Sequence, residues 1–176
     1  MPTYVGFLRA INLGATRKFP KDAVVAAAEG AGFSDVATHL NTGNVRVSTA
    51  LRSRARVESA LEEAFAADRG FAVPTVVLTP AELRAVAADA DALGGGHDGM
   101  HYVSFLKEEP TAEGTEALEA LARDGERAHV RGRAVHLLVG AEYRSARLTN
   151  AAVEKWLGVA TNRNVTVVRA LAEKWA

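Results

Sequence analysis

Seven arginine and asparagine side chains stand in short polar stretches next to apolar runs. They are Arg9, Asn12, Asn44, Arg147, Asn150, Arg163 and Asn164. The guanidinium fork of arginine matches a phosphate or carboxylate group through two parallel hydrogen bonds. A carboxamide offers both a donor and an acceptor, which suits a base edge or a sugar hydroxyl. These residue types together predict a binding site for a phosphate-bearing ligand.

The predicted positions of these side chains favour a common site. Arg9 and Asn12 follow the first predicted strand, and Asn44 lies in a hairpin turn. Asn150 lies at one predicted helix start and Arg163 at another. Strand ends and helix starts carry free backbone N–H groups, and a helix start favours negative charge. We therefore expect these side chains to share one concave surface.

A second interpretation of the same residues needs no ligand. Asparagine is favoured at helix caps and in tight turns, and an arginine such as Arg9 can simply pair with an acidic side chain. The polar stretches would then only cap helices and dock parts of the chain. The sequence leaves both interpretations open.

A metal site is the next candidate, because His97, Asp98 and His101 lie within five positions. Their spacing matches no dedicated metal site, and a strand is predicted to begin at His101. We expect a glycine-rich loop here, and neither a metal nor another cofactor. The chain has no cysteine, which excludes disulfides, thiolate zinc sites and cysteine nucleophiles.

No recognisable catalytic constellation is present. No serine lies in a G-x-S-x-G turn, and acidic pairs such as Glu62–Glu63 are typical of solvated helix faces. His129 and His136 are expected to be ordinary sheet residues. An enzyme acting on a small phosphorylated or carboxylated substrate is an alternative, in which one arginine stabilises developing charge.

The charge of the chain is balanced overall but uneven along its length. Residues 1–122 hold 11 basic and 16 acidic residues, a net charge of −5, whereas residues 123–176 hold 10 and 5, a net charge of +5. This asymmetry is compatible with an anion-binding face and equally with attraction between the two parts or to a second subunit. We predict no secretory signal and no membrane span, and hence a cytoplasmic protein.

RNA binding through an open sheet face would need aromatic side chains on which bases can stack. Tyr4 and Phe7 point to opposite faces of one predicted strand, and Tyr102 and Phe105 do so in another. Sequence-specific stacking is therefore not expected, although the basic third of the chain could hold phosphates.

The first part of the chain predicts a β-α-β-β-α-β order. Hydrophobic patterning and turn residues place a strand, a helix beginning at a proline, a hairpin, a second helix and a fourth strand, at residues 3–8, 20–30, 36–40, 45–48, 52–67 and 73–78. This order is typical of a ferredoxin-like unit. Thr79 and Glu82 then form a capping-box pattern that starts another helix.

The pattern begins again in the second part of the chain. A strand, a helix, a second hairpin and two short helices are predicted at residues 101–106, 111–121, 126–139, 149–156 and 163–173. We predict an α+β fold of two docked ferredoxin-like lobes, residues 1–79 and residues 80–176, packed as one structural unit. The second lobe is expected to be incomplete and to carry extra C-terminal helices.

Four motifs in order resemble a known bacterial family. The chain is similar to the family named domain of unknown function 1697 at four motifs: Leu8-Arg9-Ala10-Ile11-Asn12-Leu13-Gly14, Thr42-Gly43-Asn44-Val45, Arg147-Leu148-Thr149-Asn150, and Leu157-Gly158 with Thr161-Asn162-Arg163-Asn164. Its usual wording is L-R-G-I-N-V-G-G, S-G-N-V, K-L-T-N and A-T-T-R-N-W-N-T. Here Ala10 and Ala15 replace glycines, Arg147 replaces lysine, and residues 165–167 depart from the last motif. The resemblance implies paired ferredoxin-like lobes and no established activity.

Three functional hypotheses follow from these observations. The first is a protein that binds a phosphate-bearing small molecule or a nucleic acid through the seven residues. The second is the enzyme, and the third is a scaffold without a ligand. The sequence does not fix the ligand or the oligomeric state.

Overall fold

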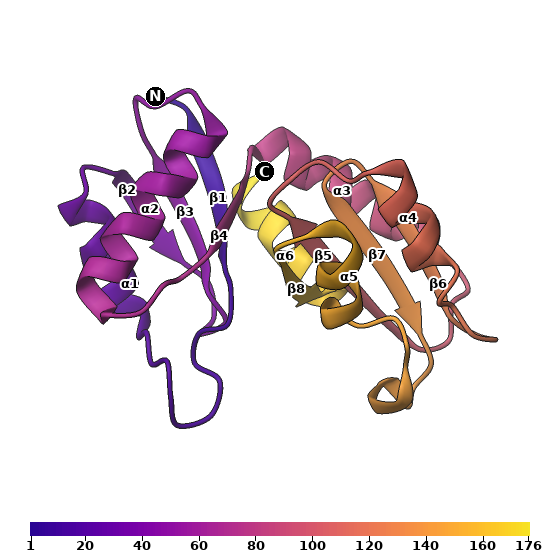
Figure 1. The fold of residues 1–176 in the computed structure, drawn as a ribbon. Helices are drawn as coiled ribbons and strands as arrows, with labels where there is room; N and C mark the ends of the chain where they lie inside the picture. The colour runs from indigo at the N-terminus through magenta and orange to yellow at the C-terminus, as the bar shows by residue number, and fades with distance from the viewer. The chain divides into compact units, whose positions relative to one another are not determined.

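The computed structural model describes residues 1–176 apart from the side chain of Tyr143. The chain divides into two compact units. Unit 1 comprises Met1–Glu82 with Trp175–Ala176, and unit 2 comprises Leu83–Lys174. Each unit contains one four-stranded antiparallel sheet (Figure 1). The predicted lobe boundary at residues 79 and 80, and the packing of the lobes as one structural unit, stay predictions.

Unit 1 is a complete ferredoxin-like unit with strand order β2-β3-β1-β4. Its elements are β1 (Thr3–Leu8), α1 (Lys21–Gly30), β2 (Ser34–Thr38), β3 (Asn44–Ser48), α2 (Arg54–Arg69) and β4 (Thr75–Leu78). Helices α1 and α2 lie side by side on one face of the sheet (Figure 1). Phe65 of α2 packs edge-to-face on Phe19, with ring centroids 5.1 Å apart, and both rings are buried. Phe19 fixes the start of α1 against this core because it directly precedes Pro20, the N-cap.

Gly43 lies where the turn before β3 touches the end of β1. The backbone N–H of Leu8 donates to the carbonyl of Gly43 at 2.8 Å. Gly43 has φ +85°, and a Cβ at this position would lie 2.7 Å from Cβ of Leu8. Only glycine satisfies both the backbone conformation and the close approach, so this residue fixes the distance between the two loops at this end of the sheet.

Strand β4 is an edge strand whose outward backbone groups bond to a helix. The N–H of Val77 donates to Oε1 of Glu58 at 3.0 Å, and the N–H of Thr75 donates to Oε1 of Glu62 at 2.8 Å. Glu58 and Glu62 lie one turn apart on α2, so both carboxylates face the same strand. Glu58 is buried, and these charge-assisted hydrogen bonds compensate part of its lost hydration.

Unit 2 repeats the architecture with strand order β6-β7-β5-β8. Its elements are α3 (Pro80–Gly94), β5 (Met100–Leu106), α4 (Ala112–Glu119), β6 (Arg127–Arg131), β7 (Ala134–Val139), a 3-10 turn at Tyr143–Ser145, α5 (Asn150–Leu157), β8 (Ala160–Asn164) and α6 (Val165–Trp175). Helices α4 and α5 pack together on one face of this sheet (Figure 1). Gly114 allows the approach, because a Cβ there would lie 2.4 Å from the carbonyl oxygen of Trp156.

The predicted capping signals are confirmed by hydrogen bonds. The N–H of Thr79 donates to Glu82 Oε2 at 2.7 Å, and the N–H of Glu82 donates to Thr79 Oγ1 at 3.2 Å. At the start of α4, Thr111 Oγ1 accepts from the N–H of Gly114. Both helices therefore begin at the residues that local chemistry dictates.

The fold class is confirmed, but the expectation that the second lobe is incomplete is wrong. Residues 160–164 form β8, which pairs with β5 and supplies the fourth strand. The segment Ala160–Asn164 lacks apolar alternation, and its pattern therefore indicates a helix start and not a strand. An edge strand that pairs on one side does not require such a pattern, and Arg163 consequently lies in a strand and not at a helix start.

Among the described residues, no helix combines the length and the apolar character needed to span a bilayer.

Candidate functional site

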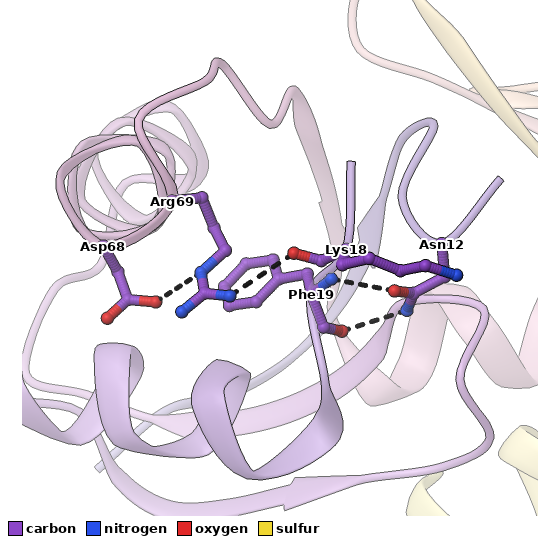
Figure 2. Close-up of polar contacts among 5 residues, drawn as sticks. All are labelled: Asn12, Lys18, Phe19, Asp68 and Arg69. Carbon is purple, nitrogen blue, oxygen red and sulfur yellow. Dashed lines mark hydrogen bonds and ion pairs between the residues drawn. The ribbon is translucent and has the colours of Figure 1, made fainter. Parts of the chain in front are cut away.

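Asn12 uses its whole carboxamide to hold the loop after β1. Its Oδ1 accepts from the N–H of Phe19 at 2.8 Å, and its Nδ2 donates to the carbonyl of Phe19 at 2.9 Å (Figure 2). Its Nδ2 also donates to the carbonyl of Asn41 at 2.8 Å. The guanidinium of Arg69 lies over the Phe19 ring and donates to the carbonyl of Lys18 (Figure 2). Asn12 therefore fastens this loop to the start of α1 and to the hairpin turn.

Asn44 and Arg9 lie at the same end of the unit 1 sheet. Asn44 is 1% exposed, and its Nδ2 donates to the carbonyl of His39 at 2.9 Å and to Thr42 Oγ1 at 3.0 Å. Arg9 is half-buried directly after β1, where its backbone N–H donates to the carbonyl of Pro74. The contacts of Asn44 shape the hairpin turn from within.

In unit 2, Asn150 belongs to a hydrogen-bonded group of three side chains. Ser104 Oγ donates to Asn150 Oδ1 at 2.8 Å, and Asn162 Nδ2 donates to Ser104 Oγ at 3.2 Å. Asn150 Nδ2 donates to the carbonyl of Ala160 at 3.1 Å. The group links the first residue of α5 to the middle of β5 and to β8.

This group borders a hollow of about 220 Å³, which we call hollow A. Its lining residues are Tyr102, Leu137, Val139, Leu148, Thr149, Asn150 and Asn162. Most of the lining is apolar, and the polar groups gather where α5 begins. Thr149 is the N-cap of α5, and its Oγ1 accepts from the N–H of Ala152 at 3.2 Å. The positive end of the α5 dipole therefore lies at the edge of hollow A.

Arg147 is exposed two residues before Thr149. Its backbone N–H donates to Glu126 Oε1 at 3.1 Å, which anchors the segment leading to α5. A guanidinium on this segment adds positive charge close to the helix start.

Arg163 lies on the other face of the sheet from Asn162, because neighbouring residues of a strand alternate. It pairs with Val103, whereas Asn162 pairs with Ser104. Arg163 is 6% exposed, and its Nη1 donates to Thr161 Oγ1 at 2.9 Å and to the carbonyl of Asn162 at 2.7 Å. Burial lowers the pKa of its guanidinium to about 10. Arg163 is thus a buried cation held by internal acceptors.

Asn164 directly precedes the last helix, α6. Its Oδ1 accepts from the N–H of Thr166 at 2.9 Å, so it caps α6. The side chain also lines a second hollow, which is separate from hollow A.

The seven predicted residues therefore fall into two groups. Unit 1 holds Arg9, Asn12 and Asn44, and unit 2 holds Arg147, Asn150, Arg163 and Asn164. That all seven meet in one hollow stays a prediction. The sequence pattern does not indicate Ser104 and Asn162 as members of the Asn150 group, since only the pairing of β5 with β8 places them opposite one another.

In the described part of the chain, no group of three or more histidine and acidic side chains is arranged to hold a metal ion. The segment from His97 to His101 contributes two imidazoles to the second hollow.

Comparisons with known proteins agree with the fold and add no activity. The family model described as "Protein of unknown function (DUF1697)" matches residues 1–136. The structure is similar to that of the conserved bacterial protein SP0830 from Streptococcus pneumoniae, with a TM-score of 0.80, 19% identity and coverage of 99% of each chain. At this identity the likeness extends to the fold alone. No curated protein matches the sequence.

Proposed function

The chain belongs to this DUF1697 family of unknown function, and we propose from the geometry of hollow A that unit 2 binds a phosphate-bearing ligand of the nucleotide class. The single observation that supports the proposal is an apolar hollow whose polar groups gather at the start of a helix. Small-molecule sites commonly combine apolar walls with a few convergent polar groups.

The walls of hollow A suit one flat ring system. Leu137, Val139 and Leu148 are buried aliphatic side chains, and the half-buried ring of Tyr102 adds an aromatic surface. The volume of about 220 Å³ lies below the roughly 300 to 1,000 Å³ of sites for drug-sized ligands. It therefore favours a single nucleotide over a polymer.

The asparagines retain hydrogen-bonding capacity toward this ring. Each carboxamide nitrogen carries two hydrogens. Asn150 uses one of them in a hydrogen bond of 3.1 Å, and Asn162 uses one in a hydrogen bond of 3.2 Å. Within the described residues, Oδ1 of Asn162 accepts no side-chain or backbone hydrogen bond. This leaves one N–H donor on Asn150, and one N–H donor and one oxygen acceptor on Asn162. Such a set matches the alternating donors and acceptors along the edge of a base.

The phosphate group would lie at the start of α5. Among the described residues, the N–H groups of Asn150 and Ala151 make no hydrogen bond, whereas those of Ala152 and Val153 bond to Thr149. Arg147 supplies a cation from the exposed segment before the helix. A helix start and an arginine together form a common arrangement for binding phosphate.

Titration of the ¹⁵N-labelled protein with AMP, adenosine and inorganic phosphate tests the proposal. AMP should saturate and shift the side-chain amide signals of Asn150 and Asn162, and adenosine should bind more weakly because it lacks the anion. Arg147→Ala should weaken AMP binding by about tenfold, as expected for loss of one charge-assisted contact. Arg84→Ala, which removes an exposed arginine of α3, serves as the matched control.

Two results would contradict the proposal. One is a lack of saturable shifts in the two carboxamides with AMP and with other purine and pyrimidine nucleotides. The other is an equal loss of AMP affinity in Arg147→Ala and Arg84→Ala. Tighter binding to an oligonucleotide than to AMP would indicate that the ligand is a nucleic acid and not a single nucleotide.

The scaffold interpretation is a second candidate for the unit 1 residues. Asn12 makes three hydrogen bonds to backbone groups of its own loops, and Asn44 is buried with two bonds inside its turn. Their carboxamides hold the fold, and the ligand site that we propose in unit 2 does not use them.

A further inference from the structure

The second hollow of unit 2, which we call hollow B, is the more polar of the two. It has a volume of about 320 Å³ and lies where α3 ends, β5 begins and α6 starts. Its lining residues are Gly94, His97, Gly99, Met100, His101, Asn164, Val165, Thr166 and Arg169. Two imidazoles, a guanidinium, a carboxamide and a hydroxyl thus surround one space.

His101 is the buried polar side chain of hollow B. Only 6% of it is exposed, and its Nε2 lies 3.1 Å from Nδ1 of His136. Its Nδ1 faces the end of α3, where a Cβ on Gly94 would lie 3.0 Å away. In the described part of the chain this Nδ1 has no hydrogen-bond partner.

The contact between His101 and His136 indicates which ring nitrogen of each residue carries the proton. His136 is 0% exposed, and its Nε2 is buried without a partner. A buried N–H without an acceptor is rarer in proteins than an unused acceptor, so His136 carries its proton on Nδ1 and donates it to Nε2 of His101. His101 then carries its own proton on Nδ1, and that N–H points toward hollow B as an uncharged donor.

The cation of hollow B is Arg169. Arg169 binds Asp91 through Nε at 2.8 Å, and no other hydrogen bond of this guanidinium occurs among the described residues. The 11-residue helix α6 starts at the same place, with its second N–H already capped by Asn164. Burial and then the charge of Arg169 lower the pKa of His101 to about 4, so the ring is neutral at pH 7.

We propose that hollow B is a binding site for an oxyanion, either inorganic phosphate or the phosphate group of a small ester. The free nitrogens of Arg169 hold two of its oxygens, the Nδ1–H of His101 donates to a third, and the start of α6 stabilises the charge. His97 is oriented away from this role, because its Nε2 lies 2.9 Å from the carbonyl of Val139 and donates to it. The site depends on no residue of hollow A.

Substitutions of Arg169 and of Asp91 should change the affinity for inorganic phosphate in opposite directions. Arg169→Gln should weaken the binding of inorganic phosphate by at least about tenfold, since it removes the bidentate cation. Asp91→Asn should strengthen it severalfold, because the carboxylate is the anion that competes for Arg169. Both side chains are largely exposed, so neither change removes a core contact.

The measurement is a titration with inorganic phosphate at pH 7 and constant ionic strength, followed by ¹⁵N NMR of the histidine side chains. Inorganic phosphate should cause a saturable shift of the His101 Nδ1 signal. A parallel titration with phenyl phosphate tests whether a phosphate ester also binds. Arg84→Gln is the matched control, and Arg147→Ala separates this site from hollow A. Both variants should bind phosphate at hollow B as the wild-type protein does.

The proposal is overturned if His101 Nδ1 shows no saturable shift, if Asp91→Asn weakens binding, or if Arg84→Gln acts as strongly as Arg169→Gln. Binding of phenyl phosphate without inorganic phosphate would assign the site to phosphate esters, the second of the two proposed ligands.

Discussion

Lowering the pH from 7 to 5 should destabilise unit 2 through the buried imidazoles of His101 and His136. Burial lowers the pKa of each ring from 6.5 to about 4. Charges that face the pair add to this effect: Arg169, His97 and His129 act on His101, and His129 and Arg131 act on His136. Asp91 opposes it at His101. The folded state therefore resists protonation of both rings.

The sign and size of the effect follow from linkage. The unfolded chain takes up protons below pH 6.5 whereas the folded chain does so only near pH 4, so stability is lost as the pH falls between these values. For one histidine the loss between pH 7 and pH 5 is about 2 kcal/mol. The two rings share one hydrogen bond, so the loss for the pair lies between about 2 and 4 kcal/mol.

Urea unfolding at pH 7, 6 and 5, followed through the backbone amide signals of β5 and β7, measures the free energy of unfolding of unit 2. Most carboxylates stay ionised above pH 5, so this range isolates the imidazoles. His136→Leu should reduce the pH dependence, as one of the two buried proton sites is lost. Arg84→Gln, a change at an exposed position of α3, is the matched control and should leave the dependence unchanged.

A free energy of unfolding of unit 2 that does not change between pH 7 and pH 5 would refute this reasoning. It would mean that the rings are accessible to water and bind protons as readily in the folded state as in the unfolded chain.

Three further predictions concern stability and can be checked by thermal and chemical denaturation. Gly43→Ala should destabilise unit 1 by about 2 kcal/mol or more, because the new Cβ is strained at φ +85° and overlaps Leu8; Gly30→Ala, which meets open space, should not. Asn12→Ala removes three hydrogen bonds and should cost unit 1 about 2 kcal/mol, and a loss below about 0.5 kcal/mol would show that water replaces them. Thr149→Ala should cost unit 2 about 1 kcal/mol through the lost cap of α5, whereas Thr166→Ala, at an exposed position, should stay close to the wild type.

Local chemistry explains which elements the sequence could predict. Thr79, Glu82 and Thr111 signal helix starts through contacts three residues away, and these contacts exist as predicted. The β-α-β-β-α-β order follows from apolar periodicity, because each helix and each inner strand must bury a face. These signals need no knowledge of distant neighbours.

Non-local pairing explains what the sequence could not predict. Residues 160–164 are polar and become a strand only because β5 offers an unpaired edge. His136 was expected to be an ordinary sheet residue, yet β7 is an inner strand buried along its whole length, so the ring meets His101 and not water. The Ser104–Asn162 contact joins residues 58 positions apart, and no local pattern announces it.

The carboxylates of α2 that bond to β4 have a counterpart in unit 2, where Glu154 of α5 accepts from the N–H of Ala160 in the edge strand β8 at 3.1 Å. Exposed strand edges are where foreign chains add on and where aggregates begin to grow. A side chain that already occupies the outward amide must be displaced before another strand can add there. The edge strands β4 and β8 are thereby protected from pairing with a further strand. Replacing Glu58 by an aliphatic residue would leave the N–H of Val77 available for such pairing.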